Sequence, residues 1–252
     1  MGLDPTRRFS TRVDDYVRYR PSYPREIIPL LERECGLTPA SRVADIGSGP
    51  GFLSRLFLDF GCEVFGVEPN ADMRHAGERL LASEPRFHSV DGRAEDTKLA
   101  DAAVDFVTAA QAFHWFDPGP ARREFVRILK PAGWVVLVWN ERLRSPGLHA
   151  DYDALIRRYA PERRSVTPDE FTSFFGHSRW RQAKLPNEQR LDWPAFEGRL
   201  RSSSYAPLPG AREYQPMMDA LERIFTAFQA GGLVTLGYDT EIYYGRLAGP
   251  EK

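Results

Sequence analysis

Several residue types and patterns that mark specialised proteins are scarce in this sequence. It contains only two cysteines, Cys35 and Cys62, which are too few for a disulfide framework or a cysteine-rich metal site. No apolar run approaches the length that spans a membrane, and the N-terminus lacks a secretory hydrophobic region. Basic and acidic residues number 34 and 35, so no charge excess favours nucleic acid or a membrane surface as a partner. We therefore expect a cytoplasmic protein without a bound metal.

A glycine-rich stretch, VADIGSGPG, lies near the start of the chain. A short β-branched strand leads into Gly47, Gly49 and Gly51, and the run Phe52–Phe60 follows with apolar residues at helical spacing. Glycine lets the backbone turn sharply and lets a ligand approach it closely. The spacing is G-x-G-x-G rather than the dinucleotide fingerprint G-x-G-x-x-G, which argues against a nicotinamide oxidoreductase but leaves it as an alternative.

An acidic residue follows the glycines at the sequence spacing expected for a residue that binds ribose. The stretch EVFGVE, Glu63 to Glu68, predicts a second strand that ends in a carboxylate. In a βαβ unit, an acid about 20 residues beyond the glycines lies at the tip of the adjacent strand, where it can accept hydrogen bonds from a ribose diol. The glycine bend and Glu68 together predict a site for a nucleoside-containing ligand.

Strands and helices alternate through the first 140 residues. This alternation predicts a parallel sheet with right-handed crossovers, whose ligands bind at the carboxyl ends of the strands. The pattern Thr240–Leu247 predicts a closing strand. Further predicted elements are helices over Pro24–Glu34, Ala71–Leu81 and Pro118–Leu129, and strands over Arg86–Val90, Val104–Ala109 and Trp134–Trp139.

Four motifs together resemble a known family. VADIGSGPG, VFGVEPN, AFHWFD and LKPAGWVVLVW are similar to the ordered motifs of class I S-adenosylmethionine-dependent methyltransferases, in particular the type 11 small-molecule group with the trans-aconitate methyltransferases. The resemblance covers about Tyr16–Asn140. It implies S-adenosyl-L-methionine as cofactor, S-adenosyl-L-homocysteine as product, and an α/β, doubly wound, mostly parallel seven-stranded sheet. In this Rossmann-like methyltransferase fold the last strand is antiparallel, and a helical cap is inserted.

The resemblance also implies roles for residues at the bend. The backbone of the glycines would approach the methionyl part of the cofactor, and Glu68 would accept the ribose hydroxyls. Asp45 would position the bend or reach the amino group through it. Where similar proteins carry an acid that meets adenine, this chain has Arg93, which leaves the backbone of Ala94, and Glu95, as readers of the base. The predicted cofactor-binding set is Tyr16, Tyr19, Arg20, Asp45, Gly47, Ser48, Gly49, Gly51, Glu68, Pro69, Met73, Ala94, Glu95 and Gln111.

Residues 1–23 form an aromatic, arginine-rich arm. In similar proteins such an arm folds over the cofactor cleft as a lid. Tyrosine faces can hold a sulfonium cation, and an arginine can pair with the cofactor's carboxylate. Tyr16, Tyr19 and Arg20 are therefore predicted either to contact the cofactor or to pack on the domain surface.

The segment AQAFHWFD follows the fourth predicted strand and holds the candidate acceptor residues. His114 lies among three aromatics and is predicted to contact the ligand, with a role as catalytic base the weaker alternative. Trp115 is either a core residue or one wall of the methyl-transfer site. The resemblance implies a small-molecule acceptor. The sequence shows no compelling acid–base set, which is consistent with a carboxylate or another pre-ionised acceptor, because a carboxylate is already ionised at neutral pH and needs no base.

The chain is predicted to be a single methyltransferase domain over residues 1–252. Its parts are the lid arm 1–23, the cofactor-binding core 24–140, a helical cap on the acceptor side 141–231, and a closing strand 232–252. Helices are expected near Pro194–Ser202 and Ala211–Ala230. A basic run from Arg142 to Arg164 predicts a solvated helix face or a docking surface for an anionic substrate.

Two other functions stay open from the sequence besides the oxidoreductase. The fold could bind S-adenosylmethionine as a sensor or scaffold without turnover. An RNA methyltransferase would need a basic groove, for which only the run from Arg142 to Arg164 is a candidate.

Overall fold

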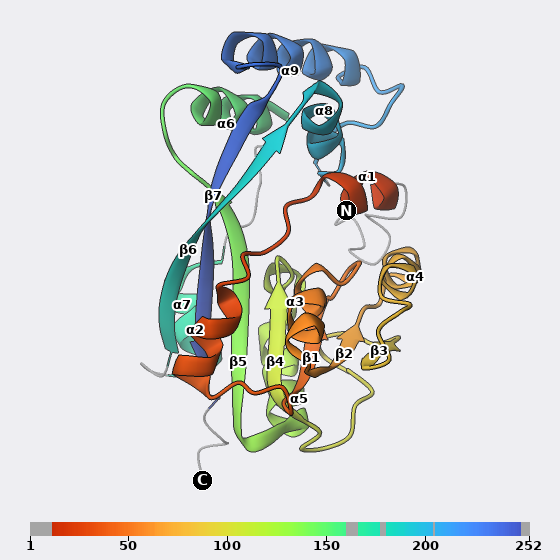
Figure 1. Ribbon diagram of the computed structural model, residues 1–252, viewed down its shortest axis with the longest axis vertical. Coiled ribbons are helices and arrows are strands. Elements are labelled where there is room, and N and C mark those ends of the chain that lie inside the picture. The colour runs from red at the N-terminus through yellow and green to blue at the C-terminus, as the bar shows by residue number, and fades with distance from the viewer. Residues whose placement is uncertain (1–11, 160–165, 177–179, 204, 248–252) are drawn as a thin grey trace. The chain divides into compact units, whose positions relative to one another are not determined.

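The structure is a computed structural model that describes residues 12–159, 166–176, 180–203 and 205–247. Its strands form one seven-stranded sheet in the order β3-β2-β1-β4-β5-β7-β6 (Figure 1). The strands are β1 Arg42–Ile46, β2 Glu63–Val67, β3 Phe87–Val90, β4 Val104–Ala110, β5 Leu129–Arg142, β6 Trp180–Leu191 and β7 Val234–Gly245. The helices are α1 Val13–Tyr19, α2 Ile27–Cys35, α3 Phe52–Phe60, α4 Ala71–Leu80, α5 Pro118–Ile128, α6 Leu148–Tyr159, α7 Pro168–Phe175, α8 Trp193–Arg201 and α9 Tyr214–Phe228, with a short 3-10 helix η2 Phe113–Trp115.

Strand order reverses between β1 and β4. The chain runs from β1 outward to β2 and β3, and then returns to place β4 and β5 on the other side of β1. All the neighbouring pairs from β3 to β5 are parallel, with Asp45 opposite Thr108 across β1 and β4. β6 and β7 run in opposite directions at the other edge (Figure 1). The predicted seven-stranded, mostly parallel sheet is confirmed, and its switch point lies where ligands of such sheets bind.

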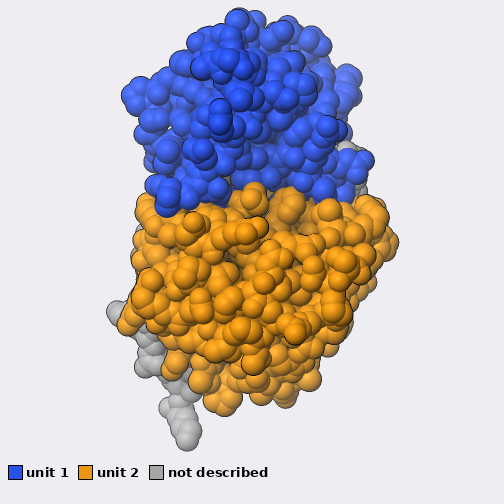
Figure 2. Space-filling model, in the orientation of Figure 1, with its two compact units in different colours: residues 1–21, 140–164, 186–239 blue, residues 22–139, 165–185, 240–252 orange. Residues whose placement is uncertain are grey.

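The described chain divides into two compact units, which Figure 2 colours separately. Unit 1 comprises residues 1–21, 140–164 and 186–239, and unit 2 comprises residues 22–139, 165–185 and 240–252. Unit 2 therefore contains β1 to β4 with α2 to α5 and α7, whereas unit 1 contains α1, α6, α8 and α9. The strands β5, β6 and β7 contribute residues to both.

Both faces of the sheet in unit 2 are covered. Val43 and Ala44 are consecutive in β1, so their side chains point to opposite faces, and both are fully buried. Val43 lies in one apolar cluster with Phe57 of α3, and Ala44 lies in a second cluster with Phe125 of α5. Burial on both faces explains why the strands read as continuous apolar runs.

Helix boundaries in unit 2 follow local signals. Helix α3 begins directly after Gly51 and spans the predicted range Phe52–Phe60. Helices α2 and α3 end at Gly36 and Gly61, whose φ angles of 71° and 109° lie in the left-handed region that favours glycine. These ends were predictable because they depend on neighbouring residues only.

Strand β5 is longer than the sequence predicted. It begins at Leu129 rather than Trp134, and the register with β4 shifts between the pairs Val104–Leu129 and Phe106–Trp134. Residues 130–133, which lie between the predicted helix Pro118–Leu129 and the predicted strand Trp134–Trp139, are therefore an irregularity within the strand. Such local insertions are not visible in an apolar pattern.

Unit 1 has its own apolar core, in which Tyr152 of α6, Phe196 of α8 and Leu221 of α9 are fully buried. The two helices predicted in this region are confirmed as α8 and α9. Strand β6, Trp180–Leu191, was not predicted, because its sequence contains Pro186 and several charged residues that are uncommon in strands. No helix within the described ranges is long and apolar enough to cross a membrane.

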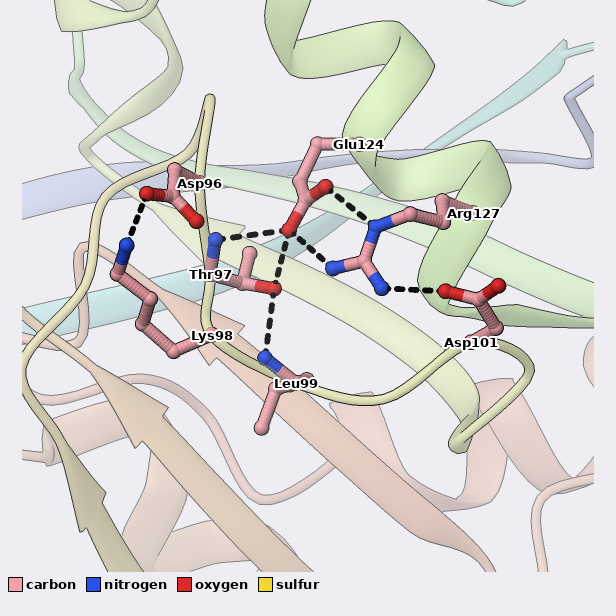
Figure 3. Close-up of polar contacts among 7 residues, drawn as sticks. All are labelled: Asp96, Thr97, Lys98, Leu99, Asp101, Glu124 and Arg127. Atoms are coloured by element: carbon pink, nitrogen blue, oxygen red, sulfur yellow. Dashed lines mark hydrogen bonds and ion pairs between the residues drawn. The ribbon is translucent and has the colours of Figure 1, made fainter.

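A charged network in unit 2 fixes the loop after β3 to helix α5 (Figure 3). One oxygen of Glu124 accepts hydrogen bonds from the backbone N–H of Thr97 at 2.8 Å and from its hydroxyl at 2.6 Å. Arg127 donates to both oxygens of Glu124 and also pairs with Asp101. Burial raises the pKa of Glu124, but the hydrogen bonds from Arg127 and Thr97 outweigh it and lower the pKa to about 2.

The Glu124 network makes a prediction for acid stability. A carboxyl whose pKa falls from its ordinary 4.5 to about 2 on folding stabilises the fold above pH 4.5, and this stabilisation is lost as the pH falls through 2. We expect Glu124→Gln to lower the free energy of unfolding at pH 7 by about 3 kcal/mol. Urea unfolding at several pH values should also show a shallower loss of stability below pH 4.5 in this variant. A loss as steep as in the wild type would contradict the assignment, and Glu222→Gln on the exposed face of α9 is the control.

Candidate functional site

The glycine bend joins the end of β1 to the start of α3. Gly47, Gly49 and Gly51 have φ angles of 65°, 54° and 86°, all in the region that side chains disfavour. The N–H of Gly47 donates to the carbonyl of Val67 at 2.8 Å, and the N–H of Gly51 donates to the carbonyl of Ser48 at 2.9 Å. The bend is thereby folded back onto the tip of β2.

The three glycines differ in what surrounds them. A Cβ added at Gly47 would lie 2.7 Å from Cβ of Ala112, and one at Gly51 would lie 2.6 Å from Cδ1 of Leu81. A Cβ at Gly49 would meet no atom within 4 Å. Packing therefore leaves no room for a Cβ at Gly47, whereas at Gly51 the nearest atom is the end of the Leu81 side chain. Gly49 has an open side where a ligand can come close to the backbone.

Glu68 reaches the bend from the end of β2. One of its carboxylate oxygens accepts a hydrogen bond from the N–H of Gly49 at 2.9 Å, and the other accepts from the N–H of Asn70 at 2.9 Å. The residue is 8% exposed, and burial raises the pKa of its carboxyl while these two N–H groups oppose the rise. A carboxylate oxygen has more than one acceptor position, so each can take a further hydrogen bond.

Asn70 supports Glu68 and was missed as a site residue. It caps α4, with its side-chain oxygen accepting from the N–H of Met73 at 2.9 Å, and it is 3% exposed. The guanidinium of Arg74 donates to the carbonyl of Glu68 at 2.8 Å. An asparagine just before a helical pattern is a recognisable capping signal, so this residue could have been found from the sequence. Met73 is buried in α4.

Asp45 lies beneath the bend at the switch point of the sheet. It is 1% exposed, and its two oxygens accept from the hydroxyls of Ser54 at 2.6 Å and Thr108 at 3.0 Å. Burial raises the pKa of Asp45 to about 6, although the hydrogen bonds from Ser54 and Thr108 oppose the rise. Of the two roles expected for this residue, positioning the bend fits the contacts, since they tie β1 to α3 and β4.

The segment after β4 lies next to the bend. Ala112 is the close neighbour of Gly47 described above, and Gln111 has a φ of 54° with its N–H bonded to the carbonyl of Val138 at 2.9 Å. The rings of His114 and Trp115 are half-buried, with centroids 4.8 Å apart. Their segment therefore contacts the bend through the Ala112 side chain and is bonded to β5 through the backbone of Gln111.

Phe113, one of the three aromatics around His114, is a core residue and not part of a pocket wall. It is 3% exposed and packs against Phe171, Phe174 and Trp139 in the core of unit 2. Sequence alone does not distinguish the two settings, because the α7 residues that cover Phe113 come much later in the chain.

The residues predicted to read adenine lie in the loop after β3. Ala94 is 3% exposed and belongs to the apolar cluster of α5. A carboxylate oxygen of Glu95 accepts from the N–H of Asp117 at 2.9 Å, so this side chain holds the start of α5. Because the Glu95 side chain is bonded to Asp117, the backbone of Ala94 is the better candidate for a contact with adenine.

Tyr16, Tyr19 and Arg20 lie in unit 1, unlike the other predicted cofactor residues. Helix α1 packs against α8, with Tyr19 next to Gly198. The guanidinium of Arg20 lies over the ring of Tyr16 and donates to the carbonyl of Ser202 at 3.0 Å. Residues 1–11 of the predicted lid arm lie outside the described residues. The contact of these three residues with the cofactor stays a prediction.

Comparisons with known proteins decide the family. A family model described as a methyltransferase domain matches residues 44–137. An uncharacterized methyltransferase of Mycobacterium tuberculosis is 38% identical over 176 residues, which cover 69% of this chain and 70% of the relative. A methyltransferase-like protein of Schizosaccharomyces pombe is 31% identical over 242 residues, 92% of each chain. This chain belongs to the class I S-adenosylmethionine-dependent methyltransferases.

A solved structure agrees with this family. One described as a type II methyltransferase from Anaeromyxobacter dehalogenans has a TM-score of 0.66 and 26% identity, and the match covers 92% of this chain and 100% of that one. The methyltransferase therefore uses S-adenosyl-L-methionine, as its motifs implied, and the nicotinamide alternative falls away.

The glycines of this methyltransferase make a prediction for stability. Alanine at Gly49 or at Gly36 meets no neighbouring atom and costs only backbone strain, about 1 to 2 kcal/mol. Alanine at Gly47 adds the overlap with Ala112, so we expect Gly47→Ala to lower the free energy of unfolding clearly more than the other two substitutions. Urea unfolding of the three variants measures this order. Equal losses would show that the bend is not packed as described.

Proposed function

We propose that this methyltransferase transfers the methyl group to a small-molecule acceptor that carries a carboxylate, and that the bend and Glu68 hold the cofactor. The observation that supports the site is the 2.9 Å hydrogen bond between the N–H of Gly49 and the Glu68 carboxylate, at the one glycine of the bend with an open side. It joins the two features that the sequence predicted to grip opposite ends of an adenosyl amino acid.

The residues present fit that cofactor. The open side of Gly49 would admit a ligand against the backbone, and the remaining acceptor positions of Glu68 would take the ribose hydroxyls. Backbone groups of Gly47 and Ser48 would approach the methionyl part, and the backbone of Ala94 would read adenine. Asp45 would act through the bend, since both of its oxygens are engaged by hydroxyls within the protein.

The chain's contribution to the reaction is alignment and exclusion of water. S-adenosylmethionine supplies a methyl group on a sulfonium, which is already a good leaving group. Holding two reactants in line can supply on the order of 7–11 kcal/mol of the barrier. His114 and Trp115 are the proposed acceptor contacts, since their segment adjoins Gly47 through Ala112.

A carboxylate acceptor fits this set of groups without a dedicated base. A carboxyl with a pKa near 4 is ionised at neutral pH, so His114 would need only to contact it. A phenol or amine acceptor would instead need a proton removed, and His114 is then the candidate base in the segment beside the bend.

The role of Glu68 can be tested by cofactor binding. We expect Glu68→Ala to weaken S-adenosylhomocysteine binding at least tenfold in isothermal titration calorimetry, because hydrogen bonds to a charged group contribute about 1.5–3 kcal/mol. The matched control is Glu63→Ala at the opposite end of the same strand, where the side chain pairs with Arg42. Unchanged affinity in Glu68→Ala would remove Glu68 from the cofactor site.

The acceptor class can be tested with a labelled cofactor and a cell extract. We expect the labelled methyl group to enter a small metabolite as an ester that mild alkali releases as methanol. Label that is removed by ribonuclease would point instead to an RNA acceptor. Tight binding of S-adenosylhomocysteine without transfer to any fraction would favour a sensor or scaffold.

A further inference from the structure

Unit 1 contains a cluster of three inward-facing arginines, of which only Arg20 is among the residues predicted to contact the cofactor. They come from distant parts of the chain: Arg20 follows α1, Arg142 ends β5, and Arg199 lies in α8. The Arg199 residue is 3% exposed, and the Arg142 side chain is 10% exposed. The Nε atoms of Arg20 and Arg199 are buried and have no hydrogen-bond partner.

Tyrosines surround these guanidinium groups. The guanidinium of Arg142 lies 5.2 Å from the centroid of the Tyr152 ring. Tyr152 is fully buried, and its hydroxyl has no hydrogen-bond partner. Arg199 donates a hydrogen bond to the hydroxyl of Ser203 at 3.4 Å and forms a side-chain hydrogen bond with Tyr238. The hydroxyl of Tyr238 donates to the side-chain oxygen of Gln189 at 2.9 Å.

Electrostatic effects and contacts both indicate that the three arginines lie near one another. Burial raises the pKa of the Tyr205 phenol, but the charges of Arg142, Arg199 and Arg20 outweigh burial and lower the pKa. Burial lowers the pKa of Arg20, and the charge of Arg199 lowers it further. The contacts agree: Arg20 and Arg199 bond to the neighbouring residues Ser202 and Ser203. The Tyr152 ring beside Arg142 lies 5.3 Å from the ring of Phe196, which is in the same helix as Arg199.

Carboxylates do not balance this charge. Arg142 forms an ion pair with Asp153, with Nη2 and Oδ1 2.7 Å apart. Arg20 and Arg199 form no ion pair with any carboxylate of the described ranges. A guanidinium stays charged at all ordinary pH values, and burying one without an anion costs several kcal/mol. The contacts with tyrosine rings, hydroxyls and carbonyls offset part of this cost but add no negative charge.

We propose that Arg20, Arg142 and Arg199 bind the anionic oxygens of a small molecule that carries carboxylate or phosphoryl groups. The planar donor fork of a guanidinium matches both groups, and an anion would supply the charge that the protein lacks here. The unpartnered Tyr152 hydroxyl can donate a further hydrogen bond. An acceptor of the carboxylate class proposed above has this chemistry, but binding of the anion does not require methyl transfer.

The sequence had placed Arg142 in a basic run, and the structure divides that run. Arg144, Arg157 and Arg158 are exposed, whereas the Arg142 side chain is turned inward. Arg163 and Arg164 lie outside the described residues. The candidate anion site is therefore formed by one member of the run together with two arginines from elsewhere in unit 1.

Anion binding to the full chain tests this proposal. Citrate and inorganic pyrophosphate are titrated by calorimetry at constant ionic strength set with sodium chloride. We expect saturable binding of at least one probe to the wild type, and at least tenfold weaker binding to Arg199→Met. Arg199→Lys keeps the charge but lacks the planar fork, so it should lie between the two. The probe that binds more tightly shows whether the site prefers carboxylate or phosphoryl groups.

Two controls keep the result interpretable. Arg158→Met removes an exposed arginine of α6 and should bind the probe within twofold of the wild type. Arg199→Met should still bind S-adenosylhomocysteine, which shows that it is folded. The proposal is overturned if neither probe binds the wild type, or if Arg158→Met weakens binding as much as Arg199→Met. A wild type that binds S-adenosylhomocysteine but neither probe would leave the proposed function standing without this site.

Discussion

The hydrogen bond between the backbone N–H of Gly49 and the Glu68 carboxylate is the contact on which the proposed cofactor site depends. It exists because three left-handed glycine conformations turn the chain back onto the tip of β2. Below it, Asp45 ties the same bend to α3 and β4 through two hydroxyls. The site is thus fixed by buried polar contacts at the switch point of the sheet, where an unmatched polar group would cost free energy.

The two units differ in the charged groups that they bury. In unit 2 the buried acids Asp45, Glu68 and Glu124 are each satisfied by hydroxyl, N–H or guanidinium donors. Among the described residues of unit 1, the buried guanidinium of Arg199 has no carboxylate partner, and its Nε atom has no hydrogen-bond partner. Buried carboxylates that accept hydrogen bonds from fixed donors can hold the backbone in place for a cofactor. A buried guanidinium without a carboxylate partner favours the binding of an anionic ligand.

How far the sequence predicts this molecule depends on the range of the interactions. The bend, helix α3 and the acid at the end of β2 depend on neighbouring residues, and the prediction agreed with the structure there. Thr108 supports Asp45 only through the pairing of β1 with β4, so the sequence did not reveal it. Strand β6 and the arginine cluster depend on contacts between segments far apart in the chain, which hydrophobic periodicity does not encode.

The most direct test of this account is a crystal structure of the full chain with S-adenosylhomocysteine. The account predicts that both ribose hydroxyls lie within hydrogen-bonding distance of the Glu68 carboxylate, with the amino-acid end of the ligand against the backbone from Gly47 to Gly49. A ligand bound away from this bend, or a Glu68 carboxylate that makes no contact with the ribose, would contradict it.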